Sequence, residues 1–330
     1  RYDLTLPLSR YFANNRNDLL TPFKVIQMDR VYRAERPQKG RLREFMQCDI
    51  DIIGNPSSDA EVDLILTTTK ALKKIGISDF TVKINDRRIL KAMAAYSGFA
   101  EADYDTVFII LDKMDKIGLD GVKEELLKEG YAEDAVTKYL ELFEKVTADI
   151  SGVQYLKETL GEFLSEEVAE NLKTIIDSVE STKSADFKMA FDPTLVRGMS
   201  YYTGPIFEIS MDEYGGSVGG GGRYDEMIGK FTGQPTPACG FSIGFERIIM
   251  LLLERDFEVP GSKNKTAYLI DKKMPSDKLL KILEQAKQAR AEGQIVNIAI
   301  MKKNKKFQKD QMTAEGYTQF EEFYADSFEG

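Results

Sequence analysis

Residues 31–54 read VYRAERPQKGRLREFMQCDIDIIG, two strand-like runs joined by a loop rich in charged and turn-forming residues. In the second run, successive side chains alternate between two faces. One face carries Met46, Cys48, Ile50 and Ile52, and the other carries Phe45, Gln47, Asp49 and Asp51. The alternation predicts a strand whose apolar face lies on a core and whose polar face lies on a cleft. A polar face exposed to solvent would give the same pattern.

The loop between the two runs favours the cleft. Its cations outnumber its acids and surround a Pro-Gln-Lys-Gly turn. They are Arg33, Arg36, Lys39, Arg41 and Arg43. Guanidinium groups present rigid donor forks that match phosphate oxygens. The loop therefore predicts a polyanionic ligand.

Composition limits the chemistry that the protein can use. The chain has 330 residues, enough for two or three domains. Its net charge of −9 argues against a non-specific polynucleotide coat, so a nucleic acid would have to meet local basic patches. There is no histidine, which excludes mechanisms that need an imidazole and most zinc sites. Cys48 and Cys239 lie in apolar runs without metal-ligand spacing and are expected to be buried.

The order of patterns along the chain predicts a mixed architecture. An antiparallel pair is expected at 23–33 and 43–54, a helix at 59–75, a strand at 80–84, helices across 86–186, strands at 187–191 and 201–211, a glycine-rich hairpin at 215–225, a helix from 237 to 254, a linker at 259–265 and a β-α-β-α-β module at 266–330. No apolar run of 18 residues and no signal peptide is present, so a cytoplasmic protein that does not enter a membrane is expected.

Two segments, the start of the chain and the helix expected at 237–254, carry candidate ligand contacts. Asp3 and Thr5 are expected on one face of a strand, with a turn into a helix capped by Asp3 as the alternative. In the helix expected from residue 237, Gly240, Gly244 and Arg247 fall on one face. Because glycine costs helix stability, this face is expected to be kept open for a ligand, and close packing of the helix is the alternative.

The chain resembles a known family in four motifs. The segments 32–35 and 41–45 resemble motif 2 of class II aminoacyl-tRNA synthetases, and GFSIGFER, 240–247, resembles motif 3. The run 33–54, LVRGMSYYT at 195–203 and GGRYD at 221–225 are similar to the histidyl-tRNA synthetase motifs. Ser200 departs from the acid usual in that family, which is expected to affect the orientation of its neighbours and not the ligand contacts. The family's motif 1 region is expected to be missing.

The resemblance implies an α+β fold with a class II synthetase-like antiparallel sheet flanked by helices, a helical insertion and a small C-terminal α/β domain. The implied division is 1–85 for the first part of the catalytic core, 86–186 for the insertion, 187–258 for the second part of the core, 259–265 for a linker and 266–330 for a shortened anticodon-binding domain. The last domain carries a candidate basic patch of Lys302, Lys303, Lys305, Lys306 and Lys309, for which a solvated charge run is the alternative.

The resemblance also implies a reaction, the ATP-dependent activation of L-histidine to histidyl-adenylate and its transfer to tRNA(His). ATP is then a substrate that arrives with Mg²⁺, and no metal site formed by the protein is expected. Arg197, Arg33 and Gln47 are the implied catalytic residues. Arg33, Glu35, Arg41, Phe45 and Arg247 are implied to bind ATP. Asp3, Thr5, Gln47, Asp51, Arg197, Tyr201, Tyr202 and Tyr224 are implied to bind histidine.

Within these sets, the resemblance gives particular roles. Arg33 is expected at the α-phosphate, Arg41 and Arg247 at the β- and γ-phosphates, and Phe45 on the adenine with Glu35 at its edge. Arg197 is expected to bridge the carboxylate and the α-phosphate. Asp3 and Thr5 are expected near the amino group, and Asp51 near the imidazole.

A homodimer is the implied assembly of the full-length protein. Two other functions have the same fold and stay open. One is a regulatory subunit of ATP phosphoribosyltransferase, against which the four arginines Arg33, Arg41, Arg197 and Arg247 and the C-terminal module argue. The other is a module that senses uncharged tRNA, against which the intact histidine motifs argue.

Overall fold

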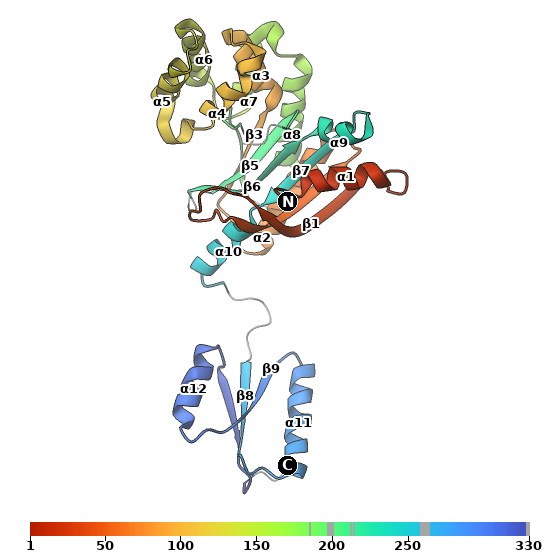
Figure 1. The fold of residues 1–330 in the computed structure, drawn as a ribbon, viewed down its shortest axis with the longest axis vertical. Coiled ribbons are helices and arrows are strands. Elements are labelled where there is room, and N and C mark those ends of the chain that lie inside the picture. The colour runs from red at the N-terminus through yellow and green to blue at the C-terminus, as the bar shows by residue number, and fades with distance from the viewer. Residues whose placement is uncertain (185, 197–200, 212, 214, 258–264, 328–330) are drawn as a thin grey trace. The chain divides into compact units, whose positions relative to one another are not determined.

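A computed structural model of the chain describes residues 1–184, 186–196, 201–211, 213, 215–257 and 265–327. Two compact units, Arg1–Leu251 and Leu252–Gly330, make up the fold (Figure 1). Within the described residues, no helix has the length and apolar character needed to cross a membrane.

The first unit is built on a seven-stranded sheet of order β1-β2-β7-β6-β5-β3-β4. Its strands are β1 (Phe23–Tyr32), β2 (Glu44–Ile53), β3 (Thr81–Asp86), β4 (Lys188–Phe191), β5 (Pro205–Met211), β6 (Gly216–Arg223) and β7 (Ala238–Ile243). All neighbours are antiparallel except β3 and β4. The predicted pair of strands on either side of the charged loop is confirmed, and so is the α+β class.

Helices flank this sheet and form a separate block beside it (Figure 1). The flanking helices are α1 (Thr5–Asn15), α2 (Asp59–Lys74), α9 (Asp225–Thr232) and α10 (Phe245–Glu254). The block contains α3 (Arg87–Ser97), α4 (Tyr104–Leu111), α5 (Met114–Lys128), α6 (Glu133–Lys145), α7 (Ile150–Leu160) and α8 (Glu166–Thr182), with 3₁₀ turns η1 (Glu101–Asp103) and η2 (Gly161–Phe163). On α8, the side chains of Val168, Leu172, Ile175 and Val179 are buried at helical spacing, as in a core-facing surface.

The strand predicted for Asp3 and Thr5 is wrong. Thr5 is the first residue of α1, and the Asp3 carboxylate accepts a hydrogen bond from the backbone N–H of Leu6 at 3.1 Å. The first N–H groups of a helix have no partner inside the helix, so an acid placed just before it satisfies one of them. The alternative, a turn into a helix held by Asp3, is the observed arrangement.

The single helix predicted from residue 237 to residue 254 is also wrong. Residues Ala238–Ile243 form β7, between β2 and β6, and α10 begins only at Phe245. A short apolar run such as ACGFSI is compatible with a buried strand or a buried helix, and periodicity alone does not separate them. Gly240 and Arg247 therefore do not share a helix face.

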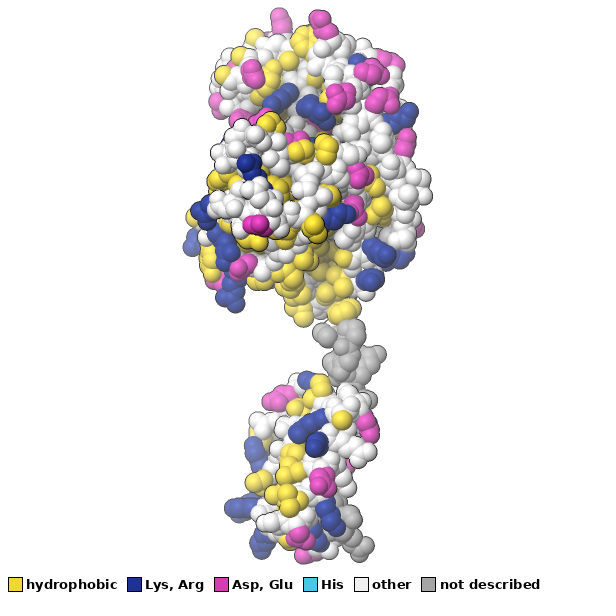
Figure 2. Space-filling view, turned by 90° about the vertical axis from the view of Figure 1, so that its right-hand side faces the viewer, with side chains coloured by type: hydrophobic (Ala, Val, Ile, Leu, Met, Phe, Trp, Pro, Cys, Tyr) yellow, Lys and Arg dark blue, Asp and Glu magenta, His cyan; other side chains and the backbone are white. Residues whose placement is uncertain are grey.

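The polar face of β2 lines a pocket, as predicted, but it is more deeply buried than most of the apolar face. Gln47, Asp49 and Asp51 are buried; on the apolar face Ile52 is buried, whereas Met46, Cys48 and Ile50 are only partly covered. On the neighbouring strand, the side chains of Ile26 and Met28 are 63% and 52% exposed. Cys239 is buried as predicted, but Cys48 is not fully buried. Apolar side chains gather on the surface of this unit (Figure 2).

A buried ion pair joins the end of β6 to the first turn of α2. The Nε and Nη2 atoms of Arg223 lie 2.6 and 2.7 Å from the two carboxylate oxygens of Glu61, which is fully buried. The same guanidinium donates to the backbone carbonyls of Asn55 and Ser57. Because its donors are well satisfied, this pair can be buried without leaving an unpaired charge.

The second unit is a three-stranded parallel sheet of order β10-β8-β9. Its elements are β8 (Lys265–Ile270), α11 (Ser276–Ala291), β9 (Ile295–Ile300), α12 (Lys305–Ala314) and β10 (Gln319–Phe323). This confirms the predicted β-α-β-α-β order. The predicted linker 259–265 lies outside the described residues except for Lys265.

The candidate lysine patch of this unit is partly neutralised. Lys305 and Lys309 both bind the carboxylate of Glu322, at 3.0 and 2.6 Å. These lysines and Tyr324 lower the pKa of Glu322 to about 2. A polyanion at this surface would therefore meet less positive charge than the sequence suggests.

The Arg223–Glu61 pair predicts a large loss of stability on removal of one partner. We expect Glu61→Ala to lower the free energy of unfolding by about 3–5 kcal/mol, because it leaves the guanidinium buried and unpaired. Chemical denaturation measures this. The matched control is Asp63→Ala on the same helix, which removes the exposed pair with Lys24 and should cost less than about 1 kcal/mol. Equal losses in the two variants would contradict the expectation.

Candidate active site

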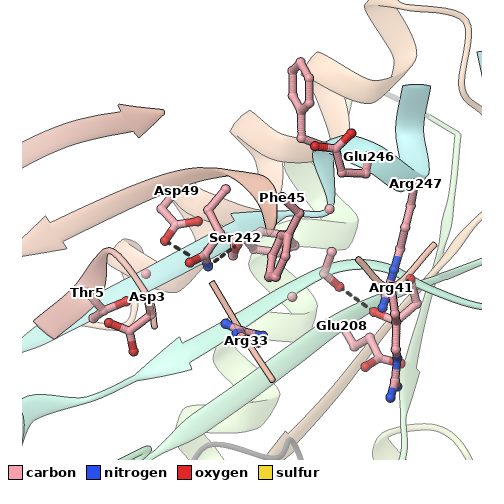
Figure 3. A pocket seen from close by; sticks show the side chains of 18 of the residues that line it. Asp3, Thr5, Arg33, Arg41, Phe45, Asp49, Glu208, Ser242, Glu246 and Arg247 are labelled. Carbon is pink, nitrogen blue, oxygen red and sulfur yellow. Dashed lines mark hydrogen bonds between the residues drawn. The ribbon is translucent and has the colours of Figure 1, made fainter. Parts of the chain in front are cut away.

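A pocket of about 460 Å³ opens over the polar face of β2 (Figure 3). Its walls come from the start of α1, the loop after β1, the strands β2, β6 and β7, and the start of α10. It brings together these sequence-predicted residues: Asp3, Thr5, Arg33, Glu35, Arg41, Phe45, Gln47, Asp51, Tyr201, Tyr202, Tyr224 and Arg247. The remaining candidate, Arg197, lies outside the described residues.

Arginines gather toward one end of this pocket, where Glu208 and Glu246 also lie. In Figure 3, Asp3, Thr5 and Asp49 lie toward one end, and Arg41 and Arg247 lie toward the other. Arg33 and Phe45 lie between the two groups. The acidic end suits a cationic group, and the arginine end suits phosphate oxygens.

The acidic end is closed by tyrosines. The hydroxyl of Tyr224, itself buried, donates to Asp51 Oδ1 at 2.7 Å. The Tyr201 ring lies 4.8 Å from the Tyr202 ring and 6.0 Å from the Tyr224 ring, centroid to centroid, with edge-to-face geometry at both contacts. The three rings pack against one another and line the pocket beside Asp51. Flat aromatic walls beside a polar group suit a planar heterocycle.

Glycine at position 240 makes room for the Asp51 carboxylate. The two residues are paired in register on β7 and β2. A Cβ atom at Gly240 would lie 2.1 Å from Asp51 Oδ1, and one at Gly221 would lie 1.9 Å from the Gly240 carbonyl oxygen. Glycines are therefore required here so that neighbouring strands and a buried side chain can approach closely.

Burial changes the acidity of two of the carboxyl groups. It raises the pKa of Asp51 to about 7, although the hydrogen bond from Tyr224 acts in the opposite direction. Burial also raises the pKa of Asp49 to about 6, opposed by the Ser242 hydroxyl, and the charge of Asp3 adds to the increase. Both groups resist ionisation until a positive charge or a donor is brought to them.

Arg33 is held flat between two aromatic rings. Its guanidinium carbon lies 4.5 Å from the Tyr2 ring centroid and 5.0 Å from the Phe45 ring centroid. Its Nε donates to the Tyr2 carbonyl at 3.2 Å. The terminal nitrogens make no hydrogen bond to another described residue, so they are free to meet a ligand. One face of Phe45 is already covered by this arginine.

Arg247 fastens the charged loop to the glycine-rich strand. It donates from Nε to the Gly40 carbonyl at 3.3 Å and from Nη1 to the Ser217 carbonyl. The neighbouring Glu246 accepts a hydrogen bond from the backbone N–H of Met46 at 3.0 Å. Arg247 therefore lines the pocket and also supports its loop, a role that the sequence did not suggest.

Other lining residues were missed as site residues. Asp49 lies on the predicted polar face of the strand, so the alternating pattern could have identified it as a site residue. Ser242 was hidden because its segment was predicted as helix. Glu208 from β5 and Asp112 from the helical block gave no local signal, because only the tertiary fold brings them to the pocket.

Among the described residues, no three His, Cys, Asp or Glu side chains form a group that could hold a metal ion. The acids nearest the arginines, Glu35, Glu208 and Glu246, line the pocket without forming such a group. The side chains of the described chain therefore do not fit a metal site built by the protein alone.

The largely antiparallel sheet flanked by helices, with the pocket on it, is the class II synthetase-like α+β fold. The family model described as histidyl-tRNA synthetase matches residues 1–248. Histidine–tRNA ligase from Leifsonia xyli subsp. xyli (strain CTCB07) is 43% identical over 328 residues, which cover 97% of this chain and 74% of that protein. The chain belongs to the histidyl-tRNA synthetase family.

Two solved structures have the same fold as this chain. The crystal structure of histidyl-tRNA synthetase from Nostoc sp. PCC 7120 has a TM-score of 0.80 and 29% identity, covering 96% of this chain and 74% of that one. A structure named as an ATP phosphoribosyltransferase regulatory subunit/histidyl-tRNA synthetase, from Bacillus halodurans C, has a TM-score of 0.78 at 24% identity, covers 98% of this chain and 79% of that one, and shows the fold alone.

Several relatives are much longer than the matched region. The chain spans between 56% and 61% of the length of seven other curated relatives that it matches, which are named histidine–tRNA ligase or probable histidine–tRNA ligase. In one of these, from Korarchaeum cryptofilum (strain OPF8), 257 residues are 40% identical, and they cover 77% of this chain and 58% of that protein.

The raised pKa of Asp51 predicts a pH-dependent stability cost. In the unfolded chain this group ionises near 3.8, and in the folded chain near 7, so the folded protein binds the extra proton and loses stability as pH rises between these values. Asp51→Asn cannot ionise and should be more stable than the wild type at pH 8, by up to about 4 kcal/mol.

Denaturant unfolding at pH 4 and pH 8, without ligands, tests this expectation. The exposed variant Asp63→Asn serves as the control and should follow the wild-type pH dependence. An Asp51→Asn curve parallel to that of the wild type would contradict the assignment of the pH effect to Asp51.

Proposed function

We propose that this protein activates L-histidine with ATP to give histidyl-adenylate and then transfers the histidyl group to tRNA(His). The observation that carries the proposal is one pocket that combines the terminal nitrogens of Arg33, which bind no other described residue, with an end lined by tyrosines and buried carboxyl groups. Family membership supports the choice of histidine and tRNA as substrates.

The chemical problem in the first step is charge, since the histidine carboxylate must approach the α-phosphate of a polyanion. Arg33 would hold the α-phosphate, because its guanidinium is fixed by Tyr2 and Phe45 and keeps two nitrogens free. Preorganised donors of this kind stabilise charge that develops in the transition state without reorganising. The carboxylate oxygen forms the new bond to phosphorus, and pyrophosphate leaves.

The other nucleotide contacts follow the order of residues in the pocket. Arg41 and Arg247 would meet the β- and γ-phosphates, and Phe45 would stack on adenine with Glu35 at its edge. Mg²⁺, bound when ATP is present, would neutralise phosphate charge. Because the described residues form no metal group, ATP oxygens would supply much of its coordination.

At the acidic end, Asp51 and Tyr224 would bind the imidazole, and Tyr201 and Tyr202 would enclose it. Asp3, Thr5 and Gln47 would face the amino group. Arg197 is assigned from its sequence motif alone as the residue that bridges the carboxylate and the α-phosphate.

A homodimer is the proposed assembly. The exposed apolar side chains of Ile26 and Met28 on β1 support it, because apolar surface of this kind is typical of protein interfaces. The cytoplasm is the proposed compartment, because the tRNA substrate is present there.

A regulator or a tRNA sensor with this fold stays as the second candidate, on the likeness to the structure from Bacillus halodurans C. Either protein could bind histidine without forming an adenylate. Amino-acid-dependent ATP–pyrophosphate exchange, measured with all twenty amino acids, separates the functions. Exchange with histidine alone supports the proposed enzyme, and no exchange with any amino acid would reject it.

Selection of histidine gives the next prediction. Asp51→Ala removes the acceptor for an imidazole N–H and should raise the KM for histidine about tenfold or more, since a hydrogen bond to a charged group contributes about 1.5–3 kcal/mol. The KM for ATP should change little. Pyrophosphate exchange measures both values, with Asp63→Ala as the control, and an unchanged KM for histidine would remove Asp51 from the binding site.

The proposed catalytic role of Arg197 gives a further prediction. If it stabilises charge that develops as carboxylate meets α-phosphate, Arg197→Ala should lower kcat for exchange by about 10²–10³ and change ATP binding much less. Arg197→Lys should recover little, because an ammonium lacks the planar fork. Transfer from pre-formed histidyl-adenylate to tRNA is the internal control. Near wild-type adenylate formation in both variants would reject the assignment.

A further inference from the structure

Asp49 is a buried carboxyl group in the middle of the pocket to which the proposed mechanism gives no role. It is 3% exposed and stands on β2 between Gln47 and Asp51, on the same face. In the sheet it is paired with Gln27 on one side and Ser242 on the other. Three successive residues on the polar face of this central strand, Gln47, Asp49 and Asp51, therefore line the pocket.

The partners of Asp49 do not satisfy it. The amide Nε2 of Gln47 lies 3.4 Å from Oδ2, a long contact that it shares with Ser242 Oγ at 3.3 Å. The other oxygen, Oδ1, is buried and has no hydrogen-bond partner in the part of the chain that the structure describes. A buried carboxylate oxygen without a donor is costly, so a group that fills this position would be bound strongly.

The missing group must be a donor, and a cation suits it best. Burial raises the pKa of Asp49, and Asp3 lies close enough for its charge to add to the increase. The charge of Arg33 opposes this increase in the pKa of Asp49. In the proposed mechanism, however, the terminal nitrogens of Arg33 bind phosphate. A positively charged nitrogen of the ligand would reduce the repulsion between Asp49 and Asp3 and would donate a hydrogen bond to Asp49 Oδ1.

The order of residues along β2 selects which nitrogen of the substrate this is. Same-face residues on a strand are about 6.6–6.8 Å apart, so Asp49 and Asp51 can contact different parts of one ligand. Asp51 is bound to Tyr224 at the tyrosine-lined end, whereas Phe45 lies at the other end of the strand against Arg33. The α-carbon of a bound amino acid must lie between the side-chain end and the phosphate end, which is where Asp49 stands.

The geometry points to Asp49 as the residue that binds the α-ammonium group of the substrate, beside Asp3, while Asp51 binds the side chain. This inference rests on the proposed function and extends it: the pocket carries separate carboxylates for the two nitrogen-containing groups of one amino acid. An ammonium group has three donors, enough to serve Asp49 Oδ1, Asp3 and the buried Oε1 of Gln47, which has no hydrogen-bond partner among the described residues.

The test compares L-histidine with 3-(imidazol-4-yl)propionate, which keeps the imidazole and the carboxylate but lacks the amino group. Histidine KM is measured by pyrophosphate exchange, and the analogue is measured as a competitor through its Ki. The variants are Asp49→Asn, Asp51→Asn and the exposed control Asp63→Asn. Asp49→Ser removes the same charge and serves if the asparagine variant does not fold.

Asp49→Asn should raise the KM for histidine by about 10- to 100-fold and leave the KM for ATP and the Ki of the analogue within about threefold of wild type. Asp51→Asn should weaken histidine and the analogue by similar factors. An unchanged histidine KM in Asp49→Asn, or a Ki that rises in parallel with it, would overturn the inference. Wild-type protein without histidine-dependent exchange would instead reject the proposed function, and the inference with it.

Discussion

The carboxyl group of Asp51 occupies the space that any side chain at position 240 would need, and much of the pocket depends on this close approach. Gly240 lets β7 pass beside the carboxylate, and the Tyr224 hydroxyl then reaches Asp51 Oδ1. The residue before Tyr224 is Arg223, whose ion pair with buried Glu61 fixes this end of β6 to α2. The polar contact at the ligand end is thus supported by a second buried contact outside the pocket.

The polar face of β2 runs from Arg33 at one end to the buried carboxyl groups of Asp49 and Asp51 at the other. Toward the charged loop, Phe45 and Tyr2 hold the Arg33 guanidinium flat, and Arg247 fastens the loop through the carbonyls of Gly40 and Ser217. Toward Tyr224, burial raises the pKa values of Asp49 and Asp51. A ligand with an anionic end and a cationic end would satisfy both, and the folded protein bears the cost of the buried acids until it binds.

Much of the fold could be predicted because its signals are local. The alternation in 44–53, the helices across 86–186 and the β-α-β-α-β order of the second unit all depend on periodicities of two or of about 3.6 residues. The errors fall where periodicity is ambiguous. The ACGFSI run of β7 is too short and too apolar to separate a strand from a helix. Asp3 lies just before α1, and its carboxylate accepts a hydrogen bond from the backbone N–H of Leu6.

The sequence alone determined the residue types of the site, since the arginine loop, the polar face of β2 and the glycine and tyrosine motifs are contiguous stretches whose chemistry is visible without coordinates. Only the tertiary structure decided which face of β2 is buried, that Arg247 supports a loop, and that Ser242, Glu208 and Asp112 line the pocket. The reason is physical: burial and the pKa of Asp49 and Asp51 depend on neighbours that are distant in sequence, and those neighbours are set by strand order and register.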